Sequence, residues 1–166
     1  MQGTRMETTY RKKLGFSRFQ IHTDIVINAT TDQVWDVLTD TATYADWAAF
    51  MVDLQGPIKD GATITAGFQL NPDKDKTVTI DHKIHVIEGV SFHWQEPGPG
   101  GICDNHHFRV ERTGNGNTRF VQHDELSGGL TWLAGGYLSK LYLRGYQAFN
   151  HSLRDEVNRR LSARAA

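Results

Sequence analysis

Apolar and polar residues alternate with a period of two in several runs before Gly128, most clearly at residues 19–28 and 77–87. This period is typical of strands, because successive side chains of a strand point to opposite faces. Turn signals such as Asp60-Gly61 and the GNGN stretch at 114–117 separate the alternating runs. The pattern predicts seven strands, at residues 19–28, 50–54, 62–70, 77–87, 90–95, 102–112 and 118–126. Short turns join most of them, which favours an antiparallel sheet.

Helical segments complete the pattern. Thr30 or Thr31 is a suitable cap for a short helix, and a second short helical turn is expected to end near Trp47. After Gly128 the apolar spacing changes to that of a helix, which we expect from about residue 130 to 161. Its apolar stripe consists of Leu138, Leu141, Tyr142, Tyr146, Phe149, Leu153 and Val157. Gly145 lies within this stripe, so it either lets the sheet approach the helix or leaves a void.

The order of the elements predicts an α+β fold. A sheet of seven strands cannot bury one of its faces alone, so the long helix must cover it and the short helices must close one end. A strongly curved sheet around one helix leaves an internal pocket lined by aromatic and a few polar groups. Residues 19–163 are expected to form this single domain. Residues 1–18 hold five basic residues and one acidic residue and are expected to be a disordered or extended segment.

Several motifs resemble the START-like (SRPBCC) superfamily, and within it the polyketide cyclase/dehydratase and lipid-transport group. They are Ile27-x-Ala29, Val34-Trp35-x-x-Leu38-x-Asp40, Tyr44-x-x-Trp47, His106-x-Phe108-x-Val110-Glu111, Thr118-Arg119-Phe120, Gly128 and Gly145-x-x-x-Phe149-Asn150-x-x-Leu153. The resemblance covers roughly residues 19–160. It implies a helix-grip fold, in which a curved seven-stranded antiparallel sheet wraps a long C-terminal helix around a cavity. It also implies a lipid-like or polyketide-like ligand, with cyclisation or dehydration in some members, but no catalytic residue is transferred by it.

Composition and charge exclude several function classes. Lys and Arg number 18 and Asp and Glu 19, and the halves split at residue 83 carry net charges of −2 and +1. No basic block of the nucleic-acid-binding kind is present, so we expect no nucleic-acid partner and no role at a membrane surface. No apolar run is long enough for integral membrane association. The single cysteine, Cys103, excludes an internal disulfide, and we expect a cytoplasmic monomer or homodimer.

The two strands before the long helix carry the candidate catalytic pair. A three-residue loop between them places His106 opposite Asp124, whereas a two-residue Asn115-Gly116 turn places His106 opposite Glu125. We prefer the first register because it gathers the apolar residues on one face. A His–Asp pair in an apolar pocket can act as a general acid or base. The same two side chains can also simply satisfy each other, or lie at the solvent-facing rim.

Seven further residues are candidates for ligand contact: His82, Trp94, Phe108, Gln122, Tyr142, Tyr146 and Phe149. A tyrosine hydroxyl in a dry pocket can hydrogen-bond a ligand carbonyl, and the alternative for each residue is an ordinary place in the core. We expect no metal and no cofactor. The histidines lack metal-site spacing, and no nucleophile or phosphate-loop motif is present.

Three functions are compatible with this pattern. The first is the binding of a small hydrophobic or aromatic ligand, lipid-like or polyketide-like, in an internal cavity. The second is a cofactor-independent enzyme of the polyketide cyclase/dehydratase type, with acid and base residues in the same cavity. The third is a structural or interaction role with a closed, solid core.

Overall fold

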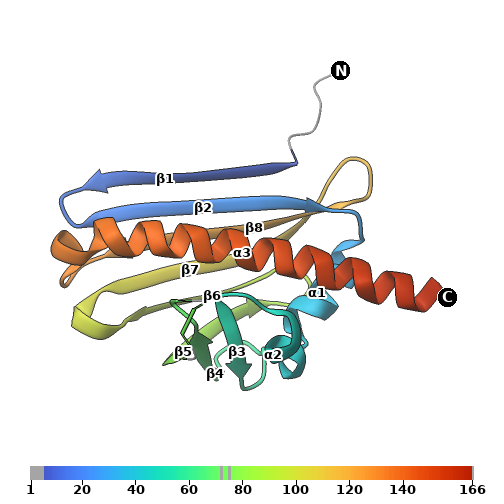
Figure 1. Ribbon diagram of the computed structural model, residues 1–166, viewed down its shortest axis with the longest axis horizontal. Coiled ribbons are helices and arrows are strands. Elements are labelled where there is room, and N and C mark those ends of the chain that lie inside the picture. The colour runs from blue at the N-terminus through green and yellow to red at the C-terminus, as the bar shows by residue number, and fades with distance from the viewer. Residues whose placement is uncertain (1–5, 72, 75, 166) are drawn as a thin grey trace.

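A single antiparallel sheet of eight strands curls around one long helix in the computed structural model, which describes residues 6–71, 73, 74 and 76–165 (Figure 1). The strands are β1 (Glu7–Gly15), β2 (Arg18–Ile27), β3 (Met51–Gln55), β4 (Thr63–Phe68), β5 (Val78–Ile87), β6 (Ser91–Pro97), β7 (Cys103–Arg112) and β8 (Thr118–Ser127). Their order across the sheet is β1-β2-β8-β7-β6-β5-β4-β3. This is the expected α+β architecture.

The eighth strand is β1, and it corrects the expected number of seven. It lies in the N-terminal segment that we expected to be disordered or extended, of which residues 1–5 fall outside the described residues. β1 pairs with β2 from Glu7 opposite Ile25 to Gly15 opposite Arg18. Its charged residues hid the strand from pattern analysis, although charged side chains are common on an edge strand because they discourage further pairing.

Three helices and two 3-10 turns complete the described chain. α1 (Thr31–Thr39) begins with a capping box, in which the Thr30 side chain accepts a hydrogen bond from the Gln33 backbone and the Gln33 side chain accepts one from the Thr30 backbone. The turn η1 (Thr41–Thr43) and α2 (Tyr44–Trp47) follow, and η2 (Pro99–Gly101) joins β6 to β7. α3 (Thr131–Ala165) runs along the concave face of the sheet (Figure 1). Within the described residues, no helix has both the length and the apolar character needed to cross a bilayer.

The β7–β8 register is the one that we preferred. His106 pairs with Asp124, and the Thr113 amide donates to the Asn117 carbonyl across the loop. The inward-facing residues of both strands therefore point toward α3. This register is what places the polar groups described below among the core aromatics.

Gly145 lets an aromatic ring approach α3 and leaves no void. A Cβ atom at this position would lie 2.3 Å from the ring of Phe50. Phe50 itself has a backbone φ of 70°, in the left-handed region that few non-glycine residues adopt. The close approach of Phe50 explains why the apolar stripe of the helix is interrupted by glycine.

Candidate functional site

A chain of buried amide and imidazole groups crosses the core from β7 to β2. The Gln122 side-chain amide donates to Asn150 Oδ1 at 2.6 Å and to the Tyr146 carbonyl at 3.1 Å. Its Oε1 atom therefore faces His106 Nε2, 3.0 Å away, which acts as the donor. Asn150 in turn donates to Thr23 Oγ1 at 3.1 Å. This chain fixes the helix against the sheet by satisfying polar groups that burial would otherwise penalise.

His106 is held as a neutral base. Burial lowers its pKa well below the ordinary value, since a charged imidazole would lose its hydration. Because Nε2 donates to Gln122, Nδ1 is the acceptor nitrogen, and it has no hydrogen-bond partner. The ring is packed against Phe108 and Tyr146, with centroid distances of 4.0 and 4.3 Å.

Two carboxyl groups form the second polar element of the core. Asp124, on β8, is fully buried and accepts a hydrogen bond of 2.8 Å from the Tyr146 hydroxyl. Asp104, on β7, is half-buried, receives a long 3.4 Å contact from Trp94 Nε1, and lies diagonally across the strand pair from Asp124. We call Asp104 and Asp124 the acid pair.

Burial places a proton on the acid pair. It raises the pKa of Asp124 well above the ordinary value, and the charge and hydrogen bond of Asp104 raise it further. Burial also raises the pKa of Asp104, although the hydrogen bond from Asp124 counteracts that rise. Burial therefore raises the pKa of both carboxyl groups and favours a proton on the acid pair.

The predicted His106–Asp124 couple is adjacent without forming a hydrogen-bonded dyad. The two residues are directly opposite each other, yet His106 bonds Gln122 and Asp124 bonds Tyr146. The proton-sharing partner of Asp124 is Asp104, its diagonal neighbour across the strand pair. The geometry therefore favours carboxyl chemistry over a histidine–aspartate dyad.

A cavity of about 190 Å³ lies beside the acid pair, between α3 and the inner face of the sheet. Asp104 and His82 are the charged or titratable side chains in its wall, and Tyr142 contributes a hydroxyl. Burial, followed by the charges of Asp104 and Asp124, raises the pKa of Tyr142, so this hydroxyl remains a donor. The rest of the lining is apolar or backbone, from Leu70, Val78, Ile80, Gly98, Pro99, Ile102, Leu126 and Leu138.

The candidate ligand-contact residues separate into two groups. His82 and Tyr142 line the cavity, and Trp94 supports it from behind, with its ring stacked on His82 at 4.5 Å. The others lie deeper, around a packed region with no room for a water-sized sphere, which contains Phe108, Gln122, Tyr146 and Phe149 together with His106. These deeper residues build the wall and the hydrogen-bond chain and do not reach the cavity.

Asp104 is the site residue that sequence reasoning missed. Asp104 is two residues before His106 on β7, so its side chain points to the same face of the strand as those of His106 and Phe108. Continuing this alternation by two residues toward the start of the strand would have identified it. The other residues of β5 that line the cavity, Val78 and Ile80, are apolar, so nothing in the sequence distinguishes them from ordinary core residues.

Metal ligation is not prepared in the part of the chain that the structure describes. No group of three or more His, Cys, Asp or Glu side chains is arranged there to hold a metal ion. The arrangement is suited to binding an apolar molecule that carries an oxygen, and to proton transfer at that oxygen or at a neighbouring carbon.

These features define the class of the protein: a curved sheet grips one helix and encloses an acidic-walled apolar cavity. The chain belongs to the family described as polyketide cyclase / dehydrase and lipid transport, whose model matches residues 18–158. No curated protein matches the sequence.

Solved structures share the fold at low sequence identity. The Zhui aromatase/cyclase from Streptomyces sp. R1128 is 17% identical, with a TM-score of 0.68 over 87% of this chain and 96% of that one. A START superfamily protein from Mycobacterium smegmatis is 12% identical, with a TM-score of 0.67 over 84% of this chain and 97% of that one. The di-domain ARO/CYC BexL from the BE-7585A biosynthetic pathway is 11% identical, with a TM-score of 0.69 over 86% of this chain and 50% of that one.

Proposed function

We propose that the protein binds a small, mainly apolar molecule bearing a hydroxyl, enol or carbonyl oxygen in the cavity beside Asp104. The observation that carries this proposal is the Asp104 carboxyl group in the wall of a mainly apolar cavity, with a second buried carboxyl group, that of Asp124, behind it. A carboxylate in such an apolar place lowers stability, so its presence favours a function over a packing role.

The size of the cavity limits the ligand. An apolar cavity of about 150 Å³ accommodates one benzene ring. The cavity here measures about 190 Å³, so it accepts one substituted ring or a short alkyl segment. A larger ligand would extend past Leu138 and Pro99 into solvent.

Two polar groups would orient the ligand. The Asp104 carboxylate accepts a hydrogen bond from a ligand hydroxyl, and the Tyr142 hydroxyl donates one to a ligand carbonyl or phenolic oxygen. Both contacts form next to apolar walls, where they are stronger than in water. We therefore expect the protein to bind an oxygen-bearing ligand more tightly than its hydrocarbon analogue.

Para-ethylphenol is a suitable test ligand, since it is one substituted ring with one hydroxyl. Titration followed by NMR should shift the methyl signals of Leu126 and Leu138, which line the cavity. Leu138→Trp fills the cavity and should abolish these shifts, while Leu133→Trp, on the exposed side of the same helix, should preserve them. Equal binding by the two variants, or shifts confined to other surfaces, would refute the proposed site.

A second candidate function, proton-transfer catalysis on the bound ligand, is favoured by the acid pair. The elevated pKa of Asp104 makes it a stronger base than an ordinary carboxylate. In this mechanism Asp104 removes a proton from the carbon next to a ligand carbonyl, and Tyr142 hydrogen-bonds the resulting enolate oxygen. Return of that proton from Asp104 to the carbon gives exchange alone. In a dehydration the enolate instead expels a β-hydroxyl, which takes the proton from Asp104 and leaves as water. The aromatase/cyclase names among the similar structures agree with such chemistry.

Acetophenone tests this step because its methyl protons can exchange but it cannot cyclise. The protein should accelerate exchange of those protons with deuterated water, as measured by NMR. Asp104→Asn should reduce the acceleration by about 100-fold or more, the usual contribution of a general base. Exchange at the buffer rate in the wild-type protein, with binding intact, would leave ligand binding as the function.

A further inference from the structure

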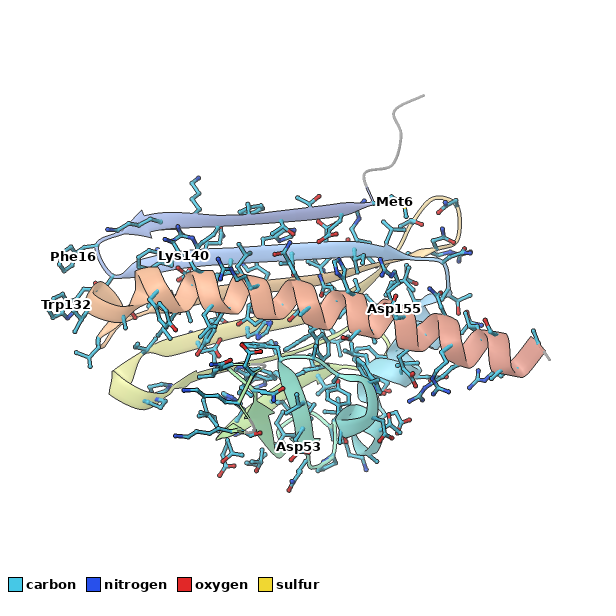
Figure 2. The ribbon with its side chains drawn as sticks, in the orientation of Figure 1. Met6, Phe16, Asp53, Trp132, Lys140 and Asp155 are labelled. Atoms are coloured by element: carbon cyan, nitrogen blue, oxygen red, sulfur yellow. The ribbon has the colours of Figure 1, made fainter. Side chains whose placement is uncertain are left out.

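The end of the molecule that carries the start of α3 exposes a cluster of large apolar side chains. Of the ten large apolar residues exposed in the described chain, six lie here: Leu14, Phe16, Leu130, Trp132, Leu133 and Tyr137. Phe16 and Trp132 are 75% and 53% exposed and stack on each other with parallel rings, 6.3 Å between centroids. Figure 2 shows both side chains projecting from this end. We call these six residues the apolar tip.

We propose that the apolar tip inserts into the interface of an anionic lipid bilayer. Exposed Trp, Tyr and Phe clustered beside Lys and Arg are typical of surfaces that enter the headgroup region of a membrane. An apolar cluster of this composition at one end of a protein is otherwise an aggregation hazard. The charges around it decide in favour of lipid.

The tip is built from two arms, and in each arm basic residues lie further from the end of the molecule than Phe16 or Trp132. In the β1–β2 hairpin, Phe16 at the turn is preceded by Lys12 and Lys13 on β1. In α3, Trp132 and Leu133 in the first turn are followed by Lys140 and Arg144. The rise per residue places Lys12 and Lys13 roughly 10–13 Å from Phe16, and Lys140 about 12 Å from Trp132. Cations at that distance would lie at phosphate level when the tip is inserted.

Acidic side chains are missing from both arms. No Asp or Glu occurs between Thr8 and Thr23, or between Leu126 and Arg154. Glu125, which flanks the hairpin, is neutralised by a bidentate contact with Arg18, at 2.7 and 2.9 Å. Dividing the chain at residue 83 conceals this asymmetry, because the two basic arms come from opposite ends of the sequence. The net charges of the two halves, −2 and +1, therefore do not describe the charge at this end of the molecule.

The tip adjoins the cavity proposed as the ligand site. The Leu130 amide donates to the Gly100 carbonyl at 3.0 Å, which ties the start of α3 to the loop around η2. Pro99 in this loop, and Leu138 two turns into α3, both line the cavity. Docking of the tip would therefore place the cavity close to the bilayer, where an apolar ligand is concentrated. The uptake of a ligand from the bilayer into the cavity rests on the proposed function, whereas docking of the tip does not.

Vesicle flotation without added ligand tests the docking. The probes are vesicles of phosphatidylcholine alone and vesicles containing about one-third phosphatidylglycerol, at low salt and at about 1 M salt, where the Debye length is about 3 Å. The protein should float with the anionic vesicles at low salt, and the Trp132 emission should shift to the blue. High salt and neutral vesicles should each weaken binding.

Surface variants assign the binding to the tip. Phe16→Ser and Trp132→Ser should each weaken partitioning on the order of tenfold, and Lys12→Gln and Lys140→Gln about fivefold each. Ile87→Ser removes another exposed apolar side chain, at the end of β5, and should have no effect. Absence of binding to anionic vesicles, or equal loss in Ile87→Ser, would overturn the proposal.

A second copy of the chain is the competing occupant, and it gives a different result. If the tip were a homodimer interface, the protein would sediment as a dimer without vesicles, Trp132→Ser would make it a monomer, and no vesicle would bind. Ligand binding is scored separately, with para-ethylphenol in vesicle-free buffer. Failure of docking with that binding intact overturns the membrane proposal alone, and the reverse result overturns the proposed function alone.

Discussion

The carboxyl groups of Asp124 and Asp104 belong to diagonal neighbours on adjacent strands, and burial raises the pKa of both. Asp124 is enclosed by the core and bonded to Tyr146, while Asp104 reaches the cavity wall. Burial favours a proton on this pair, and the pair borders the cavity through Asp104. This arrangement sacrifices stability for a polar anchor in an apolar cavity.

Asp124→Asn should therefore stabilise the protein by about 0.5–2 kcal/mol at neutral pH. The oxygen of the asparagine side chain can still accept a hydrogen bond from the Tyr146 hydroxyl. Its amide can donate to Asp104 without taking up a proton from solvent. The pKa of Asp124 is higher in the folded protein than in the unfolded chain. Asp124 therefore lowers the free energy of unfolding of the wild-type protein only above the ordinary pKa of about 3.9, and by more as the pH rises. Urea denaturation of both proteins should give equal stabilities near the acid limit and a growing gap toward neutrality.

The two tyrosines on α3 should respond differently to loss of the hydroxyl. Tyr146→Phe removes the hydrogen bond to Asp124 and should cost about 0.5–1.5 kcal/mol of stability. Tyr142→Phe should leave stability nearly unchanged and weaken an oxygen-bearing ligand, because Tyr142 lines the cavity. Thermal denaturation and para-ethylphenol titration of both variants separate the roles. Interchanged effects would mean that Tyr146, not Tyr142, faces the ligand.

Gly136 and Gly145, nine residues apart on α3, give a matched test of the helix–sheet contact. Gly145→Ala places a Cβ 2.3 Å from the Phe50 ring and should destabilise by about 1–3 kcal/mol. Gly136→Ala meets nothing within 4 Å and should stabilise the helix by about 0.5–1 kcal/mol, with Gly136 lying inside α3 as well. Denaturation midpoints of the two variants should therefore move in opposite directions. Similar shifts would show that Phe50 moves away without cost.

A row of five histidines crosses the outer face of the sheet. Direct cross-strand pairs join His22, His123, His107, His93 and His85, on β2, β8, β7, β6 and β5. The rings of His93 and His107 are stacked at 4.5 Å. Asp24 contacts His22 at one end, and Asp60 contacts His85 at the other. A shallow groove of about 310 Å³ lies over part of this row, and its open, polar character makes it a poorer ligand site than the inner cavity.

This row should make the protein sensitive to mild acid. Burial and neighbouring positive charge lower the pKa values of His93, His107 and His123. The unfolded chain then binds protons before the folded one as pH falls through about 6.5, so stability is lost below that value. Denaturation between pH 7 and pH 5 should show this loss, and His107→Gln should make the dependence shallower. A flat profile would show that the row remains neutral at no cost.

Much of the fold follows from residue patterns. The long amphipathic helix, the short helices and the strands after Phe19 all follow from apolar periodicity and turn chemistry. The sequence did not reveal β1 because it is an edge strand with many charged and polar residues. Such a strand lacks the alternation of apolar and polar residues by which the other strands were predicted. Gly145 could be flagged as an interruption of the stripe, but only the packing of Phe50 shows what fills the space.

The site was less accessible to sequence reasoning, for a different reason. Strand parity places His106 and Asp124 on the inner face, and the register pairs them. Parity does not show which polar atoms turn toward one another, and that is decided by Gln122, Asn150 and Tyr146 together. Asp104 became evident only when the cavity beside it was seen.

Carbon-13 NMR of the aspartate carboxyl groups, followed against pH with and without para-ethylphenol, tests the account most directly. Asn variants at positions 104 and 124 assign the two signals. The account predicts that Asp124 keeps its proton far above the ordinary range and that the ligand shifts the Asp104 signal. Two carboxyl groups that titrate near the ordinary value of about 3.9 and ignore the ligand would contradict it.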